Sequence, residues 1–208
     1  MKYALLALIW LTWCYVHSVL ISLTVTGYLK HRLGDRFRYY RVVYNGLALS
    51  TLIPVALYAY SIRSEPLFSW EGYWRIGQVL LLAASLFLFV AGGRHYDGLT
   101  FLGLRQLRDR SSCTGLTETC ELNTRGVLGA VRHPWYAGGL LLIWAQKMDP
   151  PLFIMSLVLS VYFVIGALLE ERKLTRIYGQ VYRDYQQEVS MFFPFKWIKK
   201  KFDGRPSP

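Results

Sequence analysis

The sequence predicts an all-α, polytopic transmembrane protein of about five spans that ends in a helical hairpin. Three observations lead to this fold class. Hydrophobic residues make up 53% of the 208 residues and charged residues only 18%, below the roughly 25% of soluble proteins. The apolar residues gather in runs long enough to cross a bilayer. The basic residues, 24 against 13 acidic ones, gather between these runs.

Five apolar runs are the candidate spans, each of which needs about 20 mainly apolar residues. The first three cover about residues 3–26, 42–60 and 76–92. No small-residue cleavage site follows the first, so we expect a retained helix. The fourth, 134–146, gives only about 20 Å of helix and spans only if it begins near Gly126. A double proline at 150–151 then interrupts the helix before the last run, 152–169. These last two runs predict the hairpin.

The net charge of +11 sorts to one side of this predicted membrane. Segments 30–41, 94–132 and 170–208 hold five, six and nine basic residues, 20 of the 24 in the chain. With five spans all three segments lie on the same side, which the positive-inside rule makes cytoplasmic. We therefore expect an integral protein of the bacterial inner membrane, with its N-terminus outside and its C-terminus in the cytoplasm. The basic excess thus follows from the orientation of the chain among membrane lipids and needs no nucleic-acid partner.

The cysteines and the intramembrane histidine give weaker signals. Cys113 and Cys120 are separated by six residues, and no histidine lies within ten residues of either. We therefore predict no metal site, and a disulfide would be unusual in a reducing compartment. His17, in the first run, is either a functional polar group or a histidine hydrogen-bonded to a neighbouring helix.

Two polar clusters flank the predicted hairpin. Before its first arm, Arg132, His133, Trp135 and Tyr136 can all bond a polar ligand, and Pro134 is suited to begin a helix. The cluster is either a ligand site or an interfacial anchor of snorkelling arginine and membrane-belt aromatics. After the last run come two adjacent carboxylates.

These carboxylates, Glu170 and Glu171, are easier to understand if the last helix continues beyond the membrane. Spacings of three and four residues then predict one helix stripe, formed by Glu171, Leu174, Tyr178, Tyr182 and Tyr185. Such a stripe is either one wall of a pocket for a cationic or adenine-bearing ligand, or an ordinary amphipathic membrane-proximal helix.

Together these motifs resemble the C-terminal signature of the isoprenylcysteine carboxyl methyltransferase family. That superfamily includes phospholipid N-methyltransferases and bacterial methanethiol S-methyltransferase. The resemblance covers about residues 122–195 and rests on Thr124-x-Gly126, Arg132-His133-Pro134-x-Tyr136-x-Gly138, Glu170-Glu171-x-x-Leu174, Tyr178-Gly179-x-x-Tyr182-x-x-Tyr185 and Phe193-Pro194. Ser190 stands where many relatives have proline. Residues 95–106, ending in Phe-Leu-Gly-Leu-Arg-Gln, are similar to a loop of the thiol-methylating branch.

The resemblance implies an integral membrane methyltransferase that uses S-adenosyl-L-methionine in a cytoplasmic cofactor pocket. Residues 1–93 would form the N-terminal transmembrane helices and 94–208 the catalytic region. The implied cofactor-binding residues are His133, Tyr136, Glu170, Glu171, Tyr178 and Tyr182. Arg132 or Arg105 would act in catalysis by holding an anionic acceptor or stabilising a thiolate. The acceptor would be a small or lipidic thiol, carboxylate or amine, with a lean towards a thiol.

Two other functions stay open at this point. Membrane sterol-type reductases share a similar C-terminal helical arrangement around NADPH. A non-catalytic membrane factor or small transporter could also keep the same scaffold. The predicted spans hold no row of ionisable residues and no inverted repeat, which disfavours a transporter.

Overall fold

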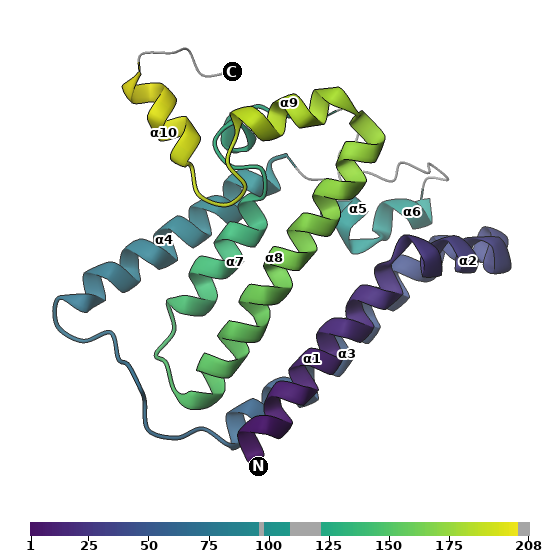
Figure 1. Ribbon diagram of the computed structural model, residues 1–208. Coiled ribbons are helices and arrows are strands. Elements are labelled where there is room, and N and C mark those ends of the chain that lie inside the picture. The colour runs from purple at the N-terminus through teal and green to yellow at the C-terminus, as the bar shows by residue number, and fades with distance from the viewer. Residues whose placement is uncertain (96–97, 109–121, 204–208) are drawn as a thin grey trace. The chain divides into compact units, whose positions relative to one another are not determined.

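A computed structural model describes residues 1–95, 98–108 and 122–203 (Figure 1). Regular structure in these ranges is helical, apart from two isolated bridges, Phe68 with Met148 and Val131 with Ser190. The all-α prediction is therefore confirmed. Cys113 and Cys120 lie outside the described residues.

The described residues divide into two units, each made of three separate segments of the sequence. One contains residues 1–68, 98–108 and 148–158, and the other contains 69–95, 122–147 and 159–203. This division follows contacts within the chain. The predicted functional boundary between residues 93 and 94 stays a prediction.

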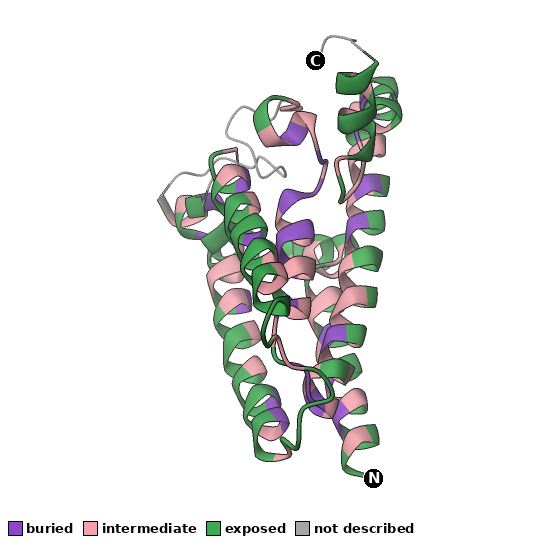
Figure 2. Cartoon of the chain, turned by 90° about the vertical axis from the view of Figure 1, so that its left-hand side faces the viewer, coloured by how far each residue is buried: buried purple, intermediate pink, exposed green. Residues whose placement is uncertain are grey.

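Among the described residues, four stretches of helix are long and apolar enough to cross a membrane. They are α1 (Lys2–Ile21), the stretch Leu23–Ser61, α4 (Trp74–Gly93) and α8 (Pro150–Tyr178). Only 11–17% of the most apolar window of each is buried by the protein itself, and Figure 2 shows exposed residues along the long helices. So much exposed apolar surface needs a lipid environment. The chain is a polytopic transmembrane protein.

In the first unit, α1 packs antiparallel to α3 (Tyr40–Ser61). Three side-chain hydrogen bonds define the register: Tyr3 with Ser64 at 3.3 Å, Trp13 with Thr51 at 3.1 Å, and Tyr44 with His17 at 2.7 Å. His17 is thus bonded to a neighbouring helix, which was one of its two expected roles.

The first predicted span is too long at its C-terminal end. α1 stops at Ile21 because Ser22 has extended backbone, and the Ser22 hydroxyl accepts a hydrogen bond from the Val25 amide at 3.3 Å. This cap begins α2 (Leu23–Leu33). The 3-10 helix η1 (Gly34–Tyr39) follows, so the basic segment before α3 is largely helical. Residues 98–108 form α5 (Gly98–Leu102) and α6 (Leu104–Arg108).

In the second unit, α7 (Pro134–Trp144) packs antiparallel to α4 (Figure 1). Three hydrogen bonds to backbone carbonyls connect them: Trp135 Nε1 to Phe89 at 3.1 Å, Ser85 Oγ to Gly138 at 2.8 Å, and Gln78 Nε2 to Ala145 at 2.9 Å. A Cβ on Gly138 would lie 3.2 Å from the Ser85 carbonyl oxygen. Small residues of this kind let membrane helices approach closely.

The opposite side of α7 packs antiparallel to α8. The contacts are Trp144 Nε1 donating to Ser160 Oγ at 2.9 Å, Phe163 against Gly139, and Tyr136 against Gly166. The break after α7 and the antiparallel return of α8 confirm the predicted hairpin. α8 has 29 residues, about 43 Å of helix, which exceeds the ~30 Å of a hydrocarbon core. Its C-terminal end therefore extends past the apolar segment.

The first arm of the hairpin is shorter than a span. α7 has 11 residues, about 16 Å of helix, and it does not begin near Gly126 because η2 (Gly126–Gly129) is a separate 3-10 helix. The chain still follows α4 for most of its length, since Trp135 lies beside Gly92 and the Ala145 carbonyl binds Gln78. The count of five spans stays a prediction.

The turn at Gly126 gives a first test of the fold. Gly126 has φ +61, and a Cβ there would lie 2.6 Å from His95 Nε2. We expect Gly126→Ala to lower the free energy of unfolding by about 1–2 kcal/mol, the cost of a left-handed backbone for a residue with a Cβ. The matched control is Gly27→Ala, because Gly27 is helical and nothing lies within 4 Å of its added Cβ. Denaturant unfolding in detergent measures both variants, and equal effects would contradict the prediction.

Candidate active site

The polar site forms where the entry to α7 meets the segment after α9 (Gln180–Glu188). The Arg132 amide donates to the Ser190 carbonyl at 2.9 Å, and the His133 amide donates to the Met191 carbonyl at 3.1 Å. These bonds hold two segments far apart in the sequence side by side. The Ser190 hydroxyl accepts a bond from the Lys196 amide at 3.1 Å, a contact that this serine can make and a proline cannot.

Glu171 is the centre of the site. Its Oε1 accepts from Arg132 Nε at 2.7 Å, and Arg132 Nη2 lies 2.6 Å away. His133 Nε2 lies 3.2 Å from the same oxygen, and Oε2 accepts from Gln186 Nε2 at 2.8 Å. The Glu171 side chain is only 9% exposed. A carboxylate this buried is stable only with several donors, and three side chains from two segments supply them.

The Arg132 guanidinium also makes several hydrogen bonds within the protein. Besides Glu171, its Nη1 donates to the backbone carbonyls of Gln186 (3.0 Å) and Val189, and its side chain is 8% exposed. The guanidinium therefore neutralises the C-terminal end of α9, where carbonyls lack helical partners. These contacts favour a positioning role for Arg132. Its catalytic role towards an acceptor stays a prediction.

Glu170 is the more accessible of the two carboxylates. Its side chain is 28% exposed, and its Oε2 lies 3.7 Å from His133 Nδ1. The His133 ring makes an edge contact with Tyr136 at a centroid distance of 5.5 Å and lies 6.2 Å from Phe192. Four of the predicted cofactor residues, His133, Tyr136, Glu170 and Glu171, are thus brought together. Carboxylate and aromatic faces in one place suit a cation.

The predicted tyrosine stripe is wrong as a single helix. α8 ends at Tyr178, and Gly179 has φ +58, so α9 starts in a new direction. The tyrosines still gather, because Tyr182, Tyr185 and Val189 form a buried cluster against Leu122, Leu174 and Tyr178. Their positions under the site come from the turn and not from helical periodicity.

The buried phenols are neutral supports for the site. Burial raises the pKa of Tyr182, and the nearby Glu171 charge raises it further. Burial likewise raises the pKa of Tyr185, whose hydroxyl donates to the Leu128 carbonyl at 2.6 Å. Both groups therefore keep their protons at neutral pH, and Tyr182 lies below the surface as packing rather than at it.

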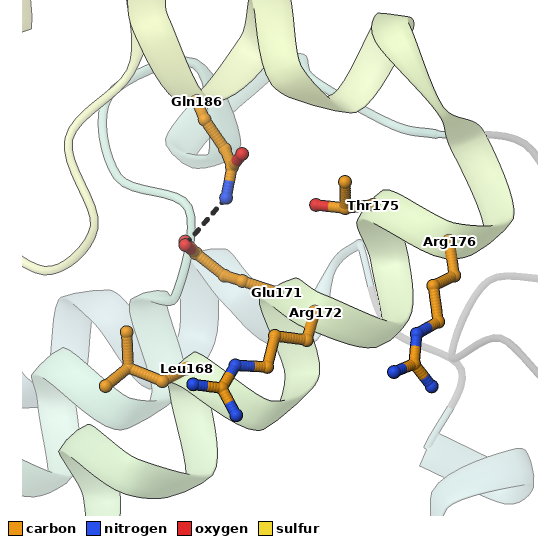
Figure 3. Close-up of a pocket in the computed structure, with 6 residues that line it drawn as sticks. All are labelled: Leu168, Glu171, Arg172, Thr175, Arg176 and Gln186. Carbon is orange, nitrogen blue, oxygen red and sulfur yellow. Dashed lines mark hydrogen bonds between the residues drawn. The ribbon is translucent and has the colours of Figure 1, made fainter.

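An open depression of about 340 Å³ lies against the other side of Glu171. Figure 3 shows Glu171 and Gln186 pointing toward each other from α8 and α9, with the Thr175 hydroxyl in the space between these helices. Leu168, Arg172 and Arg176 complete the lining. Thr175, Gln186 and the two arginines were not among the residues predicted from the sequence. The four-residue spacing of Arg172 and Arg176 after the apolar run was the available signal.

One further predicted residue belongs to the other unit. Arg105 lies in α6, in the first unit, and its role stays a prediction. Within the described ranges no group of three or more His, Cys, Asp or Glu side chains could hold a metal ion. The described site is built from an ion pair, a histidine and aromatic rings.

These features define the class of the protein. It is an integral membrane protein in which an Arg-His-Pro-x-Tyr segment joins paired glutamates after the last apolar helix, and it fits the isoprenylcysteine carboxyl methyltransferase-like membrane methyltransferase superfamily. Residues 5–148 match the family described as NnrU protein, and the chain belongs to this family.

Curated relatives carry a functional name. The chain is 42% identical over 65 residues to a methanethiol S-methyltransferase of Pseudomonas deceptionensis, which covers 31% of this chain and 25% of the relative. It is 29% identical over 124 residues to a methanethiol S-methyltransferase of Crocosphaera subtropica, and this match covers 58% of this chain and 44% of the relative. Methanethiol S-methyltransferase 1 of Bradyrhizobium diazoefficiens is 39% identical over 67 residues, a match that covers 32% of this chain and 24% of the relative.

The matched segments thus span less than half of the length of these relatives. No solved structure matches the chain.

Proposed function

We propose that the protein is an integral membrane methyltransferase that uses S-adenosyl-L-methionine and methylates a small thiol. The observation that carries this proposal is the convergence of Glu170, Glu171 and His133 beside the entry to α7. A family resemblance alone would leave the site undefined, whereas this geometry supplies groups of the right charge for the cofactor.

The residues present fit this cofactor chemically. Its sulfonium and ammonium groups are positive, and Glu170 offers a partly exposed carboxylate near the rings of His133 and Tyr136. Its carboxylate is negative, and Arg172 and Arg176 line the adjoining depression. Tyr178 and Tyr182 would support this wall from within, as part of the tyrosine cluster.

When bound, S-adenosyl-L-methionine supplies an electrophilic methyl group on a positively charged sulfur. The protein's contribution is binding and alignment. Glu171, fixed by Arg132, His133 and Gln186, joins α7, α8 and α9 into one wall. A wall held in one geometry reduces the entropy cost of aligning two reactants. The buried tyrosines exclude water below it.

A small thiol is the acceptor that the relatives favour, since those matched are named methanethiol S-methyltransferases. The similarity of residues 95–106 to a loop of the thiol-methylating branch also favours a thiol. We propose that Arg105 binds the acceptor, as the sequence predicts, while Arg132 acts through Glu171. In an Arg105→Gln variant, the KM for the thiol should rise while the affinity for S-adenosyl-L-methionine stays unchanged, and an unaltered KM would remove Arg105 from the site.

Calorimetric titration of the purified full chain separates this function from its alternatives. We expect saturable heat with S-adenosyl-L-methionine and none with NADPH or buffer. Heat with NADPH alone would favour a sterol-type reductase. No heat with either ligand would favour a non-catalytic factor, and both results would contradict the proposal.

We further propose that the site faces the cytoplasm of a bacterial cell, where the cofactor is made, with the N-terminus outside. A fluorescent protein fused after Pro208 should then fluoresce, since its chromophore matures in the cytoplasm. A dark fusion that is correctly inserted would reverse this orientation.

A further inference from the structure

The helix after the site has an apolar stripe that the described residues leave exposed. α10 (Phe195–Phe202) reads Phe-Lys-Trp-Ile-Lys-Lys-Lys-Phe. Phe195 is 71% exposed, Ile198 40% and Phe202 87%. Their spacing of three and four residues places them on one side of the helix. A soluble helix seldom exposes three large apolar residues on one side, so this stripe marks an interaction surface.

The four lysines of α10 divide into two pairs. Lys196 Nζ donates to the carbonyls of Gln186 and Gln187, both at 2.9 Å, and Lys200 Nζ lies 3.4 Å from Glu188 Oε2. Lys196 and Lys200 thus hold α10 against the C-terminal end of α9. At 100° per residue, the other pair, Lys199 and Lys201, falls on the two flanks of the apolar stripe. Lys201 Nζ also lies over the Trp197 ring, 5.2 Å from its centroid.

Flanking lysines beside an apolar stripe are the pattern of a helix that lies in the membrane interface. The apolar residues enter the boundary between headgroups and acyl chains, and the lysines reach out to anionic headgroups. A lipid surface is present near α10, because α4 in the same unit is long and apolar enough to cross the membrane. Positive charge on both flanks selects an anionic surface.

We propose that α10 docks on the anionic lipid surface of the membrane that the chain crosses, through Phe195, Ile198 and Phe202 with Lys199 and Lys201. This surface takes no part in the proposed methyl transfer, but hydrogen bonds connect α10 to the residues around Glu171. Lys196 binds the Gln186 carbonyl, which also accepts from Arg132, and the Gln186 side chain binds Glu171. Docking therefore holds the end of α9 against the site.

Hydrogen exchange of the full chain in lipid nanodiscs tests this proposal. The amides of residues 195–202 are followed in phosphatidylcholine alone and in a mixture with phosphatidylglycerol. Two interfacial lysines strengthen docking on an anionic surface about 30-fold, so exchange in α10 should slow by up to this factor in the mixture. Lys199→Gln with Lys201→Gln should remove the difference between the two lipids.

The matched control removes two charges elsewhere. Lys30→Gln with Arg36→Gln should leave the lipid dependence of α10 intact. Phe202→Ser should speed exchange in both lipids, since the apolar contact acts in each. Equal exchange in the two lipids, or an undiminished difference in the Lys199 and Lys201 variant, overturns the proposal. Slowing that depends on protein concentration also overturns it, because the stripe would then be covered by a second copy.

Discussion

Glu171→Ala is expected to abolish binding of S-adenosyl-L-methionine and to lower the free energy of unfolding by about 3–5 kcal/mol. Removing one partner of a buried ion pair leaves the other charge without compensation, and this cost is of that order. Here the remaining partner is Arg132, whose side chain is 8% exposed. The substitution also releases Gln186 and His133, so the wall between α7, α8 and α9 loses its common contact. Unfolding in detergent and calorimetry measure the two effects.

The neighbouring carboxylate is the matched control. Glu170→Gln keeps the shape of a side chain that is 28% exposed, so unfolding should change by less than about 1 kcal/mol. Its affinity for S-adenosyl-L-methionine should fall about 10- to 100-fold, the value of a hydrogen bond to a charged group. A stable Glu171→Ala variant, or a Glu170→Gln variant that binds the cofactor normally, would contradict these assignments.

Arg132→Gln should have the second largest effect, through Glu171 rather than through the acceptor. We expect a loss of stability of about 3–5 kcal/mol and a rise in the KM for the cofactor together with a fall in kcat. Arg132→Lys should restore charge but only part of the activity, since an ammonium cannot reproduce the planar fork of Nε and Nη contacts. Steady-state kinetics with each substrate varied separately measures this pattern.

A double-mutant cycle distinguishes the two roles of Arg132. If it acts through Glu171, then Arg132→Gln and Glu171→Gln should couple by about 0.5–3 kcal/mol in the free energy of unfolding. If Arg132 also holds the acceptor, Arg132→Gln should raise the KM for the thiol and Glu171→Gln should not. An Arg132→Ala variant with full turnover would remove the residue from the mechanism altogether.

The helices and the central site residues could be predicted because their signals are local. Uncharged apolar runs define the spans, the double proline at 150–151 defines the hairpin, and Arg132-His133 precedes a short helix that begins with Pro134. The convergence of His133 with Glu170 and Glu171 followed from closing that hairpin.

The errors arise where a single residue or a distant contact decides the structure. Ser22 ends α1 by capping α2, and Gly179 ends α8 by adopting φ +58. Periodicity continues through both positions, so it does not reveal these breaks. The contacts of Arg132 with the carbonyls of Gln186 and Val189 depend on where the C-terminal end of α9 lies, which no local pattern specifies.

The transfer of a labelled methyl group tests the proposed function most directly. Membranes that contain the full chain are incubated with S-adenosyl-L-methionine labelled in its methyl group and with methanethiol. We predict labelled dimethyl sulfide from the unmodified chain and none from Glu171→Ala. The absence of any labelled product from the unmodified chain, or equal product from Glu171→Ala, would contradict the methyltransferase assignment and its site.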